Sequence, residues 1–383
     1  MRRPKSDDEL VFLPLGGAGE IGMNLNAYGY GPPDARQWII VDIGVTFGRE
    51  DATPGVELIL PDPGYLEGEQ ENILGIVLTH AHEDHIGALA WLWPRLKAPV
   101  YATPFTAALV REKLREQNLL EKVPLTVLPL KGKLDLGPFD IEYITLTHSI
   151  PEPNGLAIRT PLGLVWHTGD WKIDPDPLIG DLTDEAALRA MADEGVLAMV
   201  CDSTNVFVEG VSGSEADVRE KLTKVIAGCT GRVAVTAFAS NVARVETALL
   251  AARACGRTPV LVGRSMHRIY AAAKGVGLLA EAPTPLAEED VGAMEPSKVL
   301  YLCPGSQGEP RAALSRIARG EHRHVKLTNG DTVVFSSRVI PGNEAAIHAL
   351  YNMFIDRGVD LITADDHPVH VSGHPARDEL RQL

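Results

Sequence analysis

The stretch THAHEDHIG, residues 79–87, places three histidines and two acidic residues within six consecutive positions. It follows the apolar segment NILGIVL (72–78), which predicts a buried strand, and it runs into IGALAWLWPRL (86–96), whose spacing predicts a helix that ends near Pro94. Imidazole and carboxylate groups are ligands for Zn²⁺ and Mn²⁺. Solubility rarely explains so many potential ligands at the end of an apolar strand, so the stretch predicts a metal site.

The positions within this stretch suggest two ions. Alternate side chains in a turn that leaves a strand can converge, so we expect His80 and His82 to share one ion. Asp84 and His85 come where the chain turns into the helix, and we expect them to face a second, adjacent ion. Glu83 falls between them and is expected to point elsewhere.

Further candidates follow other predicted strands. His148 follows IEYITLT, Asp170 follows LGLVWHTG, and Asp42 follows QWIIV. Two ions roughly 3.5–4 Å apart can polarise an electrophile and supply hydroxide from bound water, and Asp170 is suited to bridge them. Asp42 either binds metal or only receives hydrogen bonds from the backbone or a histidine, in which case it orients the site without contacting the metal. His167 is expected in the core or behind the ligands, and the remaining histidines considered are expected to be structural or exposed: His267, His322, His324 and His348.

Length, composition and charge limit the class of protein. A chain of 383 residues predicts one large domain or two, and 45% apolar with 23% charged residues is typical of a globular protein. The formal charge of −15 counts against binding nucleic acid by overall electrostatics, although it does not exclude a locally basic channel. No run approaches the roughly 18 apolar residues of a membrane helix, and MRRPKSDDEL is not followed by the apolar h-region of a signal peptide. We therefore expect no signal peptide and a cytoplasmic location. The four cysteines form no CxxC pair and are expected to be reduced.

The order of predicted elements indicates a layered α/β architecture with two domains. Paired strands come first, followed by alternating strands and helices, and a βαβ succession begins after VLAMVCDSTN (196–205). That succession predicts a parallel sheet in a second domain. We place the first domain at residues 1–207, the second at 208–357, and a return to the first domain at 358–383.

A glycine-rich segment near the N-terminus resembles a dinucleotide-binding fingerprint. Gly17, Gly19 and Gly22 have GxGxxG spacing, and Asp42 follows 20 residues after Gly22. That fingerprint requires a helix to begin at the glycines, but MNLNAYGYGPPD follows here and predicts a strand and turns. A turn between two strands therefore explains the glycines better.

At this point the motifs resemble a known family. HAHEDH is similar to the HxHxDH signature of metallo-β-lactamase-fold hydrolases, in which Asp42, His148 and Asp170 follow the expected order; this much also fits glyoxalase-like thioesterases and lactamases. Later motifs narrow the resemblance to bacterial ribonuclease J, a β-CASP metallo-β-lactamase nuclease, from about residue 10 to the end. These motifs are LPLGGAGEIGMN, THSIPE, HTGDWKID, CDSTN, TAFASNVARV, GRSM, PGSQGEPRAALSRIA, DTVVFSSRVIPGNE and HVSGH.

The resemblance implies a fold and a set of roles. The fold would be a metallo-β-lactamase αββα sandwich with an inserted β-CASP parallel α/β domain. His80, His82 and His148 would hold one zinc, Asp84 and His85 the second, with Asp170 between them and Asp42 in support. Asp202 would be the acidic β-CASP motif beside His85 or its neighbours, and His374 would act near the scissile phosphate as a general acid or hydrogen-bond donor. The implied catalytic residues are thus His374, Asp84, Asp170 and Asp202, and the implied RNA and phosphate contacts are Ser240, Asn241, Arg264, Ser265, Ser372, Gly373 and His374.

The resemblance also implies a reaction and partners. It predicts a ribonuclease with two Zn²⁺ per subunit, or Mn²⁺ or Mg²⁺ instead, acting as a 5′-to-3′ exonuclease and endonuclease on single-stranded, 5′-monophosphorylated RNA. We expect no membrane partner, and we expect the chain to form a homodimer or tetramer. Local arginines would attract the phosphodiester: Arg244, Arg264, Arg268 and Arg338.

One departure leaves alternatives open. The family carries another ligand histidine in a PxHGE-like motif, which this sequence does not reach before Leu383. The expectation is therefore a fragment of a longer protein or a truncated form. A catalytically weak RNA-binding component and a small-molecule metallohydrolase remain as alternative functions, although an inserted domain of roughly 150 residues is large for a small substrate.

Overall fold

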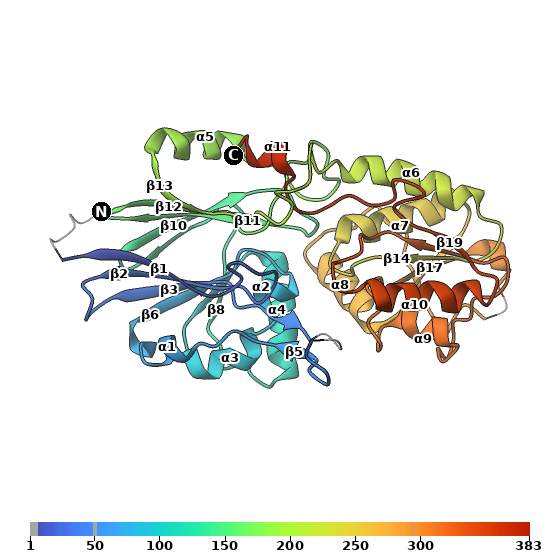
Figure 1. Ribbon diagram of the computed structural model, residues 1–383, viewed down its shortest axis with the longest axis horizontal. Coiled ribbons are helices and arrows are strands. Elements are labelled where there is room, and N and C mark those ends of the chain that lie inside the picture. The colour runs from blue at the N-terminus through green and yellow to red at the C-terminus, as the bar shows by residue number, and fades with distance from the viewer. Residues whose placement is uncertain (1–6, 49–51, 293) are drawn as a thin grey trace. The chain divides into compact units, whose positions relative to one another are not determined.

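The computed structural model describes residues 7–48, 52–292 and 294–383, which form two compact units (Figure 1). The first unit contains the chain up to Ile173, residues 180–211 and residues 373–383; the second contains residues 174–179 and 212–372. The return to the first unit therefore comes at 373, not at 358 as expected. The reason is that β19 (Asp360–Ile362) pairs with β18 (Thr332–Phe335) and so belongs to the sheet of the second unit.

Two sheets form the centre of the first unit. The first has the order β1-β2-β3-β6-β7-β8, antiparallel over its first three strands and parallel over the last four. The second has the order β13-β12-β11-β10-β9 and is antiparallel except for the β12–β13 pair. The first sheet's strands are β1 (Glu9–Gly16), β2 (Leu25–Gly31), β3 (Gln37–Val41), β6 (Ile73–Val77), β7 (Val100–Ala102) and β8 (Leu125–Val127). Those of the second are β9 (Lys133–Leu136), β10 (Phe139–Thr145), β11 (Asn154–Thr160), β12 (Gly163–His167) and β13 (Val196–Val200).

Apolar residues from both sheets meet in one core. The cluster joins Tyr28 and Val41 of the first sheet to Ile141, Leu156 and others of the second. β2 is buried along its whole length, and β3 is buried except for Gln37, which explains the apolar run WIIV in β3. Burying the inner faces of both sheets supplies the main stabilisation of this unit.

Helices cover the outer faces, which gives the expected αββα sandwich. The first sheet carries α1 (Gly64–Glu67), α3 (Leu89–Leu96) and α4 (Pro104–Glu116), and the second carries α5 (Glu185–Glu194) and the short α11 (Arg377–Leu380) (Figure 1). Met191 of α5 and Leu380 of α11 pack against a cluster that includes Trp166 of β12. A short hairpin, β4 (Thr46–Phe47) and β5 (Leu58–Ile59), and the turn helices η1 (Gln70–Asn72) and α2 (Glu83–Ile86) complete the unit.

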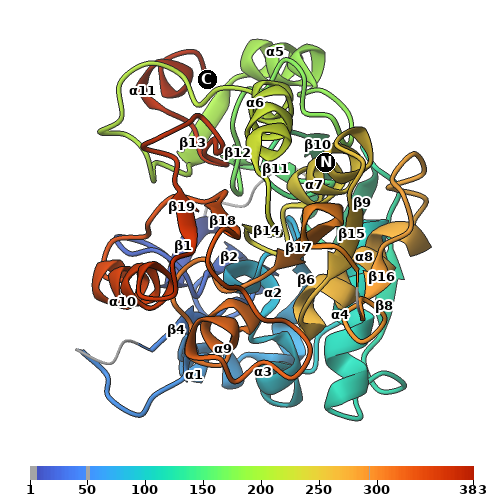
Figure 2. The same cartoon turned by 90° about the vertical axis from the view of Figure 1, so that its right-hand side faces the viewer.

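The second unit is a parallel sheet between helices, as the βαβ succession predicted. Its strand order is β16-β15-β17-β14-β18-β19, and every pair is parallel. Figure 2 shows α9 and α10 on one side of this sheet and α6 and α7 on the other. The elements not yet bounded are α6 (Glu215–Gly228), β14 (Val233–Thr236), α7 (Val242–Ala254), β15 (Thr258–Leu261), α8 (Arg264–Gly275), β16 (Leu286–Ala287), η2 (Pro296–Lys298), β17 (Val299–Cys303), α9 (Ala313–Arg319) and α10 (Glu344–Ile355).

The glycine-rich segment forms a loop between two antiparallel strands. Gly17, Gly19 and Gly22 have φ angles of 86°, 77° and 97°, and the chain continues into β2 without a helix. The expected turn is confirmed, and the segment lacks the helix N-terminus that a dinucleotide site needs.

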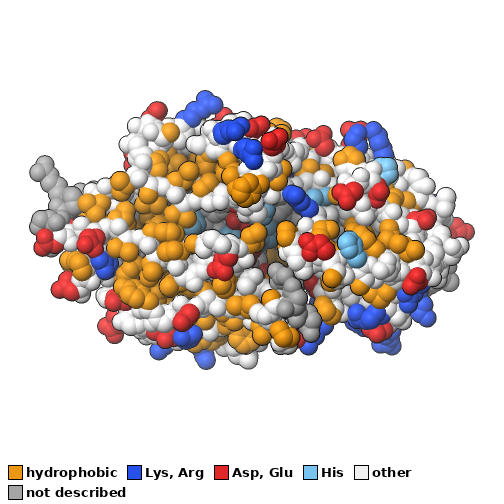
Figure 3. Space-filling model, in the orientation of Figure 1, with side chains coloured by type: hydrophobic (Ala, Val, Ile, Leu, Met, Phe, Trp, Pro, Cys, Tyr) orange, Lys and Arg blue, Asp and Glu red, His pale blue; other side chains and the backbone are white. Residues whose placement is uncertain are grey.

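The surface matches the mixed composition of the chain. On the face shown in Figure 3, acidic and basic side chains are interspersed and hydrophobic side chains lie between them. Among the described residues, no helix combines the length and hydropathy that crossing a bilayer would require.

Candidate metal centre

Three imidazoles in the first unit point at a common position. His80 Nε2 lies 3.1 Å from His82 Nδ1, and His148 Nε2 lies 3.0 Å from the same atom. His80 follows β6, His82 is the N-cap residue of α2, and His148 follows β10. The ends of two strands from different sheets therefore bring these ligand candidates together, as the sequence predicted.

Asp170 joins this triad to a second group. Its Oδ2 lies 3.9 Å from His80 Nε2 and 3.7 Å from His148 Nε2, and it lies 3.3 Å from His85 Nε2. His85 Nε2 is in turn 3.6 Å from Asp84 Oδ2. The potential ligand atoms of His80, His82, His148 and Asp170 lie within 4.8 Å of one another, and so do those of Asp84, His85 and Asp170. One carboxylate thus stands between two candidate cation sites.

Asp42 orients ligands on both sides of this centre. Its Oδ2 receives hydrogen bonds from His85 Nδ1 at 2.7 Å and from the Thr79 hydroxyl at 2.8 Å, and its Oδ1 accepts from the Thr79 main-chain N–H. The Thr79 hydroxyl donates its single hydrogen to Asp42 and therefore accepts from His80 Nδ1, which lies 3.0 Å away. Asp42 is fully buried and has φ +63°, a strained conformation for a non-glycine residue. The imidazoles of His80 and His85 consequently present Nε2 to the centre.

His148 is oriented by the segment that carries His374. Its Nδ1 donates to the Gly373 carbonyl at 2.5 Å, so its Nε2 faces the centre. Gly373 lies so close that a Cβ there would be 2.7 Å from His148 Cε1, which explains the requirement for glycine. This part of the HVSGH motif therefore acts as a backbone support for a ligand.

Asp202, expected near His85 or its neighbours, pairs with His374 next to Asp170. His374 Nδ1 is 2.8 Å from Asp202 Oδ2 and 3.8 Å from Asp170 Oδ2, and these three residues form a third cluster of potential ligand atoms. Asn205 donates to the His374 carbonyl at 3.2 Å, which fixes the backbone at this position. The carboxylate of Asp202 thus orients the imidazole of His374, the residue that the family resemblance places near the scissile phosphate.

Burial and charge set the protonation of these groups. Burial lowers the pKa of His80 and His82 well below the usual value and lowers the pKa of His148 to about 4, so all three are neutral at pH 7. Burial alone would lower the pKa of His85, but Asp170 and the neighbouring carboxylates raise it well above the usual value. Burial would raise the pKa of Asp170, but the adjacent imidazoles hold it well below.

The pKa of Asp84 is raised, unlike that of Asp170, and the pKa of His374 is raised, unlike that of His148. Burial raises the pKa of Asp84, although the nearby His85 acts to lower it. Burial would lower the pKa of His374, but Asp202, Asp170 and Asp84 raise it to about 9. His374 is therefore largely protonated at neutral pH.

The donor set fits divalent cations. Because Thr79 and Gly373 accept hydrogen bonds from the Nδ1 atoms of His80 and His148, both Nε2 atoms carry lone pairs. Both lone pairs face His82 Nδ1, which can donate at most one hydrogen. A cation can accept all three nitrogens at once, and neutral imidazole with carboxylate is a donor set that suits Zn²⁺, Mn²⁺ or Mg²⁺ to different degrees.

Three further residues were expected to lie outside the ligand set, namely Glu83, His167 and His322. Glu83 is exposed and pairs with Lys113 at 2.6 Å, away from the centre. His167 is buried and its Nδ1 is 2.8 Å from the Tyr28 hydroxyl, behind the ligands. His322 is buried within the second unit and accepts from the Val325 N–H at 3.2 Å.

Two of the residues expected near phosphate have structural roles in the second unit. Arg244 is fully buried; it pairs with Glu215 at 3.0 Å and donates to the carbonyls of Ser336 and Val369. Asn241 caps α7, accepting from the Arg244 N–H and donating to Glu215. The expectation that Arg244 attracts the phosphodiester is therefore corrected, because its guanidinium is already neutralised and inaccessible. The amide of Asn241 is likewise engaged at both ends.

Other predicted phosphate contacts remain accessible. Arg264 and Ser265 are exposed in the first turn of α8, and Arg338 is exposed after β18. Ser240 and Ser372 are partly buried in loops of the same unit. Gly373 and His374, by contrast, belong to the first unit.

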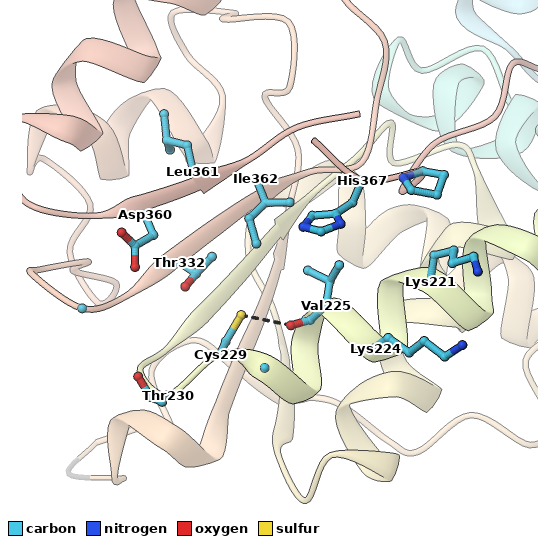
Figure 4. A pocket seen from close by; sticks show the side chains of 13 residues that line it. Lys221, Lys224, Val225, Cys229, Thr230, Thr332, Asp360, Leu361, Ile362 and His367 are labelled. Atoms are coloured by element: carbon cyan, nitrogen blue, oxygen red, sulfur yellow. Dashed lines mark hydrogen bonds between the residues drawn. The ribbon is translucent and has the colours of Figure 1, made fainter. Parts of the chain in front are cut away.

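A hollow in the second unit does not contain any of these residues. It has a volume of about 690 Å³ and lies among the C-terminal part of α6, β19 and the following loop, lined by Lys221, Lys224 and His367 among others (Figure 4). The Cys229 thiol beside it contacts the Val225 carbonyl at 3.3 Å. None of the clusters of potential ligands lies here among the described residues, so the centre in the first unit is the candidate site.

Sequence reasoning did not identify two residues that touch the ligands. Thr79 links Asp42 to His80, and Asn24 contacts the Asp84–His85 turn. Thr79 directly precedes the histidine motif, which was a usable signal. Asn24 is 60 residues away from Asp84 in the sequence and was assigned only to the predicted strand and turns of MNLNAYGYGPPD.

Comparison with known proteins agrees with this architecture. Residues 26–149 match the metallo-β-lactamase superfamily, and residues 230–354 match the family described as ribonuclease J, beta-CASP domain. A crystal structure of a protein of unknown function from Enterococcus faecalis has a TM-score of 0.60 over 98% of this chain and 91% of its own; at 14% identity it shows the fold alone.

Curated relatives give the family. The chain is 52% identical to ribonuclease J of Sinorhizobium meliloti over 98% of this chain and 67% of that protein. It is 44% identical to ribonuclease J of Corynebacterium glutamicum over 97% of this chain, which spans only 51% of that relative's length. This chain therefore belongs to the ribonuclease J family of RNA-processing nucleases, with a metallo-β-lactamase domain and a β-CASP domain.

Proposed function

We propose that this chain is a ribonuclease that hydrolyses RNA phosphodiesters at a centre of two divalent cations. The observation that carries the proposal is the position of Asp170 between the His80–His82–His148 group and the Asp84–His85 group. Zn²⁺ is the proposed ion, with Mn²⁺ or Mg²⁺ as alternatives, because imidazoles predominate among the ligands.

The cations would supply Lewis acidity toward the phosphate oxygens and a lowered pKa for a coordinated water. The chain supplies the geometry: Asp42 and Thr79 hold His80 and His85, and the Gly373 carbonyl holds His148. Ligands fixed in this way need little rearrangement when a substrate binds, which lowers the cost of reaching the transition state.

His374 is the proposed proton donor to the leaving oxygen. Its Nδ1 is bonded to Asp202, so Nε2 is the nitrogen available to a substrate. The raised pKa of His374, about 9, keeps this imidazole protonated at neutral pH, as a general acid requires. Asp202 is then a positioning residue that holds the ring and stabilises its charge.

The proposed substrate is single-stranded RNA with a 5′-monophosphate, cleaved by both 5′-to-3′ exonuclease and endonuclease action. Ser372, Gly373 and His374 would contact phosphate near the scissile bond, and Ser240, Arg264 and Ser265 would contact the RNA in the β-CASP domain. Asn241 is not included, because its side-chain amide and its backbone N–H are both bonded within the second unit. A cytoplasmic location and a dimer or tetramer complete the proposal. The family name of the relatives supports RNA as the substrate, and the donor chemistry of the centre supports divalent cations.

Incubation with RNA tests the proposal. Purified protein with Zn²⁺ or Mn²⁺ should cleave a 5′-monophosphorylated oligonucleotide faster than its 5′-triphosphorylated counterpart, and His82→Ala should abolish cleavage. Full activity in His82→Ala would contradict the assigned centre. Tight RNA binding without cleavage would favour an RNA-binding component, and turnover of nitrocefin or a thioester without RNA cleavage would favour a small-molecule hydrolase.

A further inference from the structure

The loop between β1 and β2 is built closely against the metal-binding turn. A Cβ at Gly17, which has φ +86°, would lie 2.2 Å from Asn24 Oδ1, so only glycine leaves room for this side chain. A Cβ at Gly44 would lie 1.6 Å from the Asp84 carbonyl oxygen. The Gly44 N–H donates to the Asn24 carbonyl at 2.8 Å. The glycines therefore allow two backbone segments to close around the Asp84–His85 turn.

Asn24 is the residue through which this loop contacts the turn. Its main-chain N–H donates to the Asp84 carbonyl at 2.9 Å, and its side-chain Nδ2 donates to the same oxygen at 3.1 Å. Nδ2 also lies 3.2 Å from His85 Nε2, the ring atom that faces Asp84 and Asp170. Two donors on one carbonyl fix the orientation of the peptide that joins the two ligand residues.

These contacts concern only one of the two candidate cation sites. Within the part of the chain that the structure describes, Asn24 has no hydrogen bond to His80, His82 or His148. Those three imidazoles are oriented instead by Thr79 and Gly373 or held by the turn itself.

We propose that Asn24 is a positioning residue for the second cation: it presets the Asp84–His85 turn so that the Asp84 carboxylate and His85 Nε2 bind that cation together. This inference rests on the proposed two-cation centre and gives the glycine-rich segment a function, as the frame that places Asn24. Residues that orient metal ligands commonly change metal affinity about 10- to 100-fold when they are replaced.

Cation titration of the full chain tests this role without relying on catalysis. The metal-free protein is titrated with Co²⁺, followed by its visible absorption, and with Zn²⁺ by calorimetry. We expect Asn24→Ala to weaken binding of the second equivalent about 10- to 100-fold and to leave the first equivalent unchanged. Asn24→Leu, which is close in shape but has neither the amide donor nor a metal-binding oxygen, should show the same selective loss if Asn24→Ala does not fold.

A matched control comes from the same loop. Glu20 is exposed and its carboxylate accepts from the Gly17 N–H at 3.2 Å, so Glu20→Ala perturbs the loop without touching the turn. It should bind both equivalents as the wild type does. Wild-type affinities for both equivalents in the Asn24 variants would overturn the inference, and so would an equal loss of both, since that indicates a general folding role. If the wild type binds only one cation, the proposed two-cation centre fails as well.

Discussion

At the scale of single residues, Asp42 affects more of the centre than its position outside the ligand set suggests. Its carboxylate receives hydrogen bonds from His85 and Thr79, and Thr79 in turn accepts from His80. Asp42→Asn keeps the volume but removes the charge and replaces one acceptor with a donor. We expect it to weaken Zn²⁺ binding about 10- to 100-fold in a calorimetric titration.

Glu83 provides the comparison for Asp42 because it is an acid in the same motif that faces away from the centre. It pairs with Lys113 on the surface. Glu83→Gln should therefore leave Zn²⁺ affinity unchanged. A loss equal to that of Asp42→Asn would mean that net charge, not hydrogen bonding to the ligands, controls affinity.

His167 makes stability depend on pH. Burial lowers its pKa to about 4 in the folded chain, whereas an unfolded histidine has a pKa of about 6.5. Above pH 6.5 both states are neutral and this residue adds no pH dependence. As the pH falls from 6.5 toward 4, only the unfolded state takes up the proton, so up to about 3 kcal/mol of stability is lost.

Denaturant unfolding of the metal-free protein at several pH values checks this expectation. His167→Gln cannot take up the proton, so its free energy of unfolding should change less between pH 6.5 and 4 than that of the wild type. Tyr28→Phe, which removes the hydroxyl 2.8 Å from His167 Nδ1, keeps the titrating ring and should retain the steeper dependence. Parallel pH profiles for wild type and His167→Gln would refute the assignment.

The sequence identified the six candidate ligands that the structure brings together, because a dense histidine motif and acids after predicted strands can be recognised without a structure. The sequence could not give their hydrogen-bond partners. Asp202, expected near His85 or its neighbours, bonds to His374, 172 residues away, and Asn24 bonds to Asp84 across 60 residues. Such pairs depend on how loops meet in three dimensions, which local pattern does not specify.

At the scale of elements, sequence periodicity predicted the strands that lead to the site. It did not predict features that depend on tertiary packing. β19 was assigned to the first domain, yet its three residues pair with β18. α3 continues two residues past Pro94 to Leu96, because a proline near a helix end removes only one hydrogen bond. α5 and α10 were not predicted, since each covers a sheet with only a few buried residues.

The N-termini of α6 and α7 are joined by a buried ion pair that should be costly to break. Arg244 and Glu215 are both nearly inaccessible, and Arg244 also bonds to the loop after β18 and to Val369. Arg244→Met leaves the Glu215 carboxylate buried without its partner. We expect a loss of about 3–5 kcal/mol in the free energy of unfolding, measured by chemical denaturation.

Two further variants separate this ion pair from general charge effects. Lys224→Ala, which removes an exposed ion pair with Glu220 on the same helix α6, should cause little change. The double variant Arg244→Met, Glu215→Leu should be more stable than Arg244→Met alone, because no unpaired charge is then buried. A double variant that is less stable would argue against this explanation.

At the scale of the whole molecule, the candidate ligands are distributed unevenly. All six belong to the first unit, whereas the second unit carries the buried Arg244–Glu215 pair and none of these ligands. A formal charge of −15 also favours cation binding over unassisted binding of RNA. Cations should therefore stabilise one unit selectively and reduce the local negative potential where the phosphodiester must approach.

Scanning calorimetry with and without a chelator tests this separation. Cations that bind the folded first unit stabilise it by about 2.7 kcal/mol at a free concentration 100 times the dissociation constant. We therefore expect the chelator to lower the melting temperature of the first unit and to leave the transition of the second unit in place, giving two resolved transitions. His82→Ala should show the lower transition with or without Zn²⁺, because the triad around His82 Nδ1 is incomplete. If the chelator shifts both transitions equally, the two units unfold as one cooperative body. If it shifts neither transition, bound cations do not stabilise the first unit.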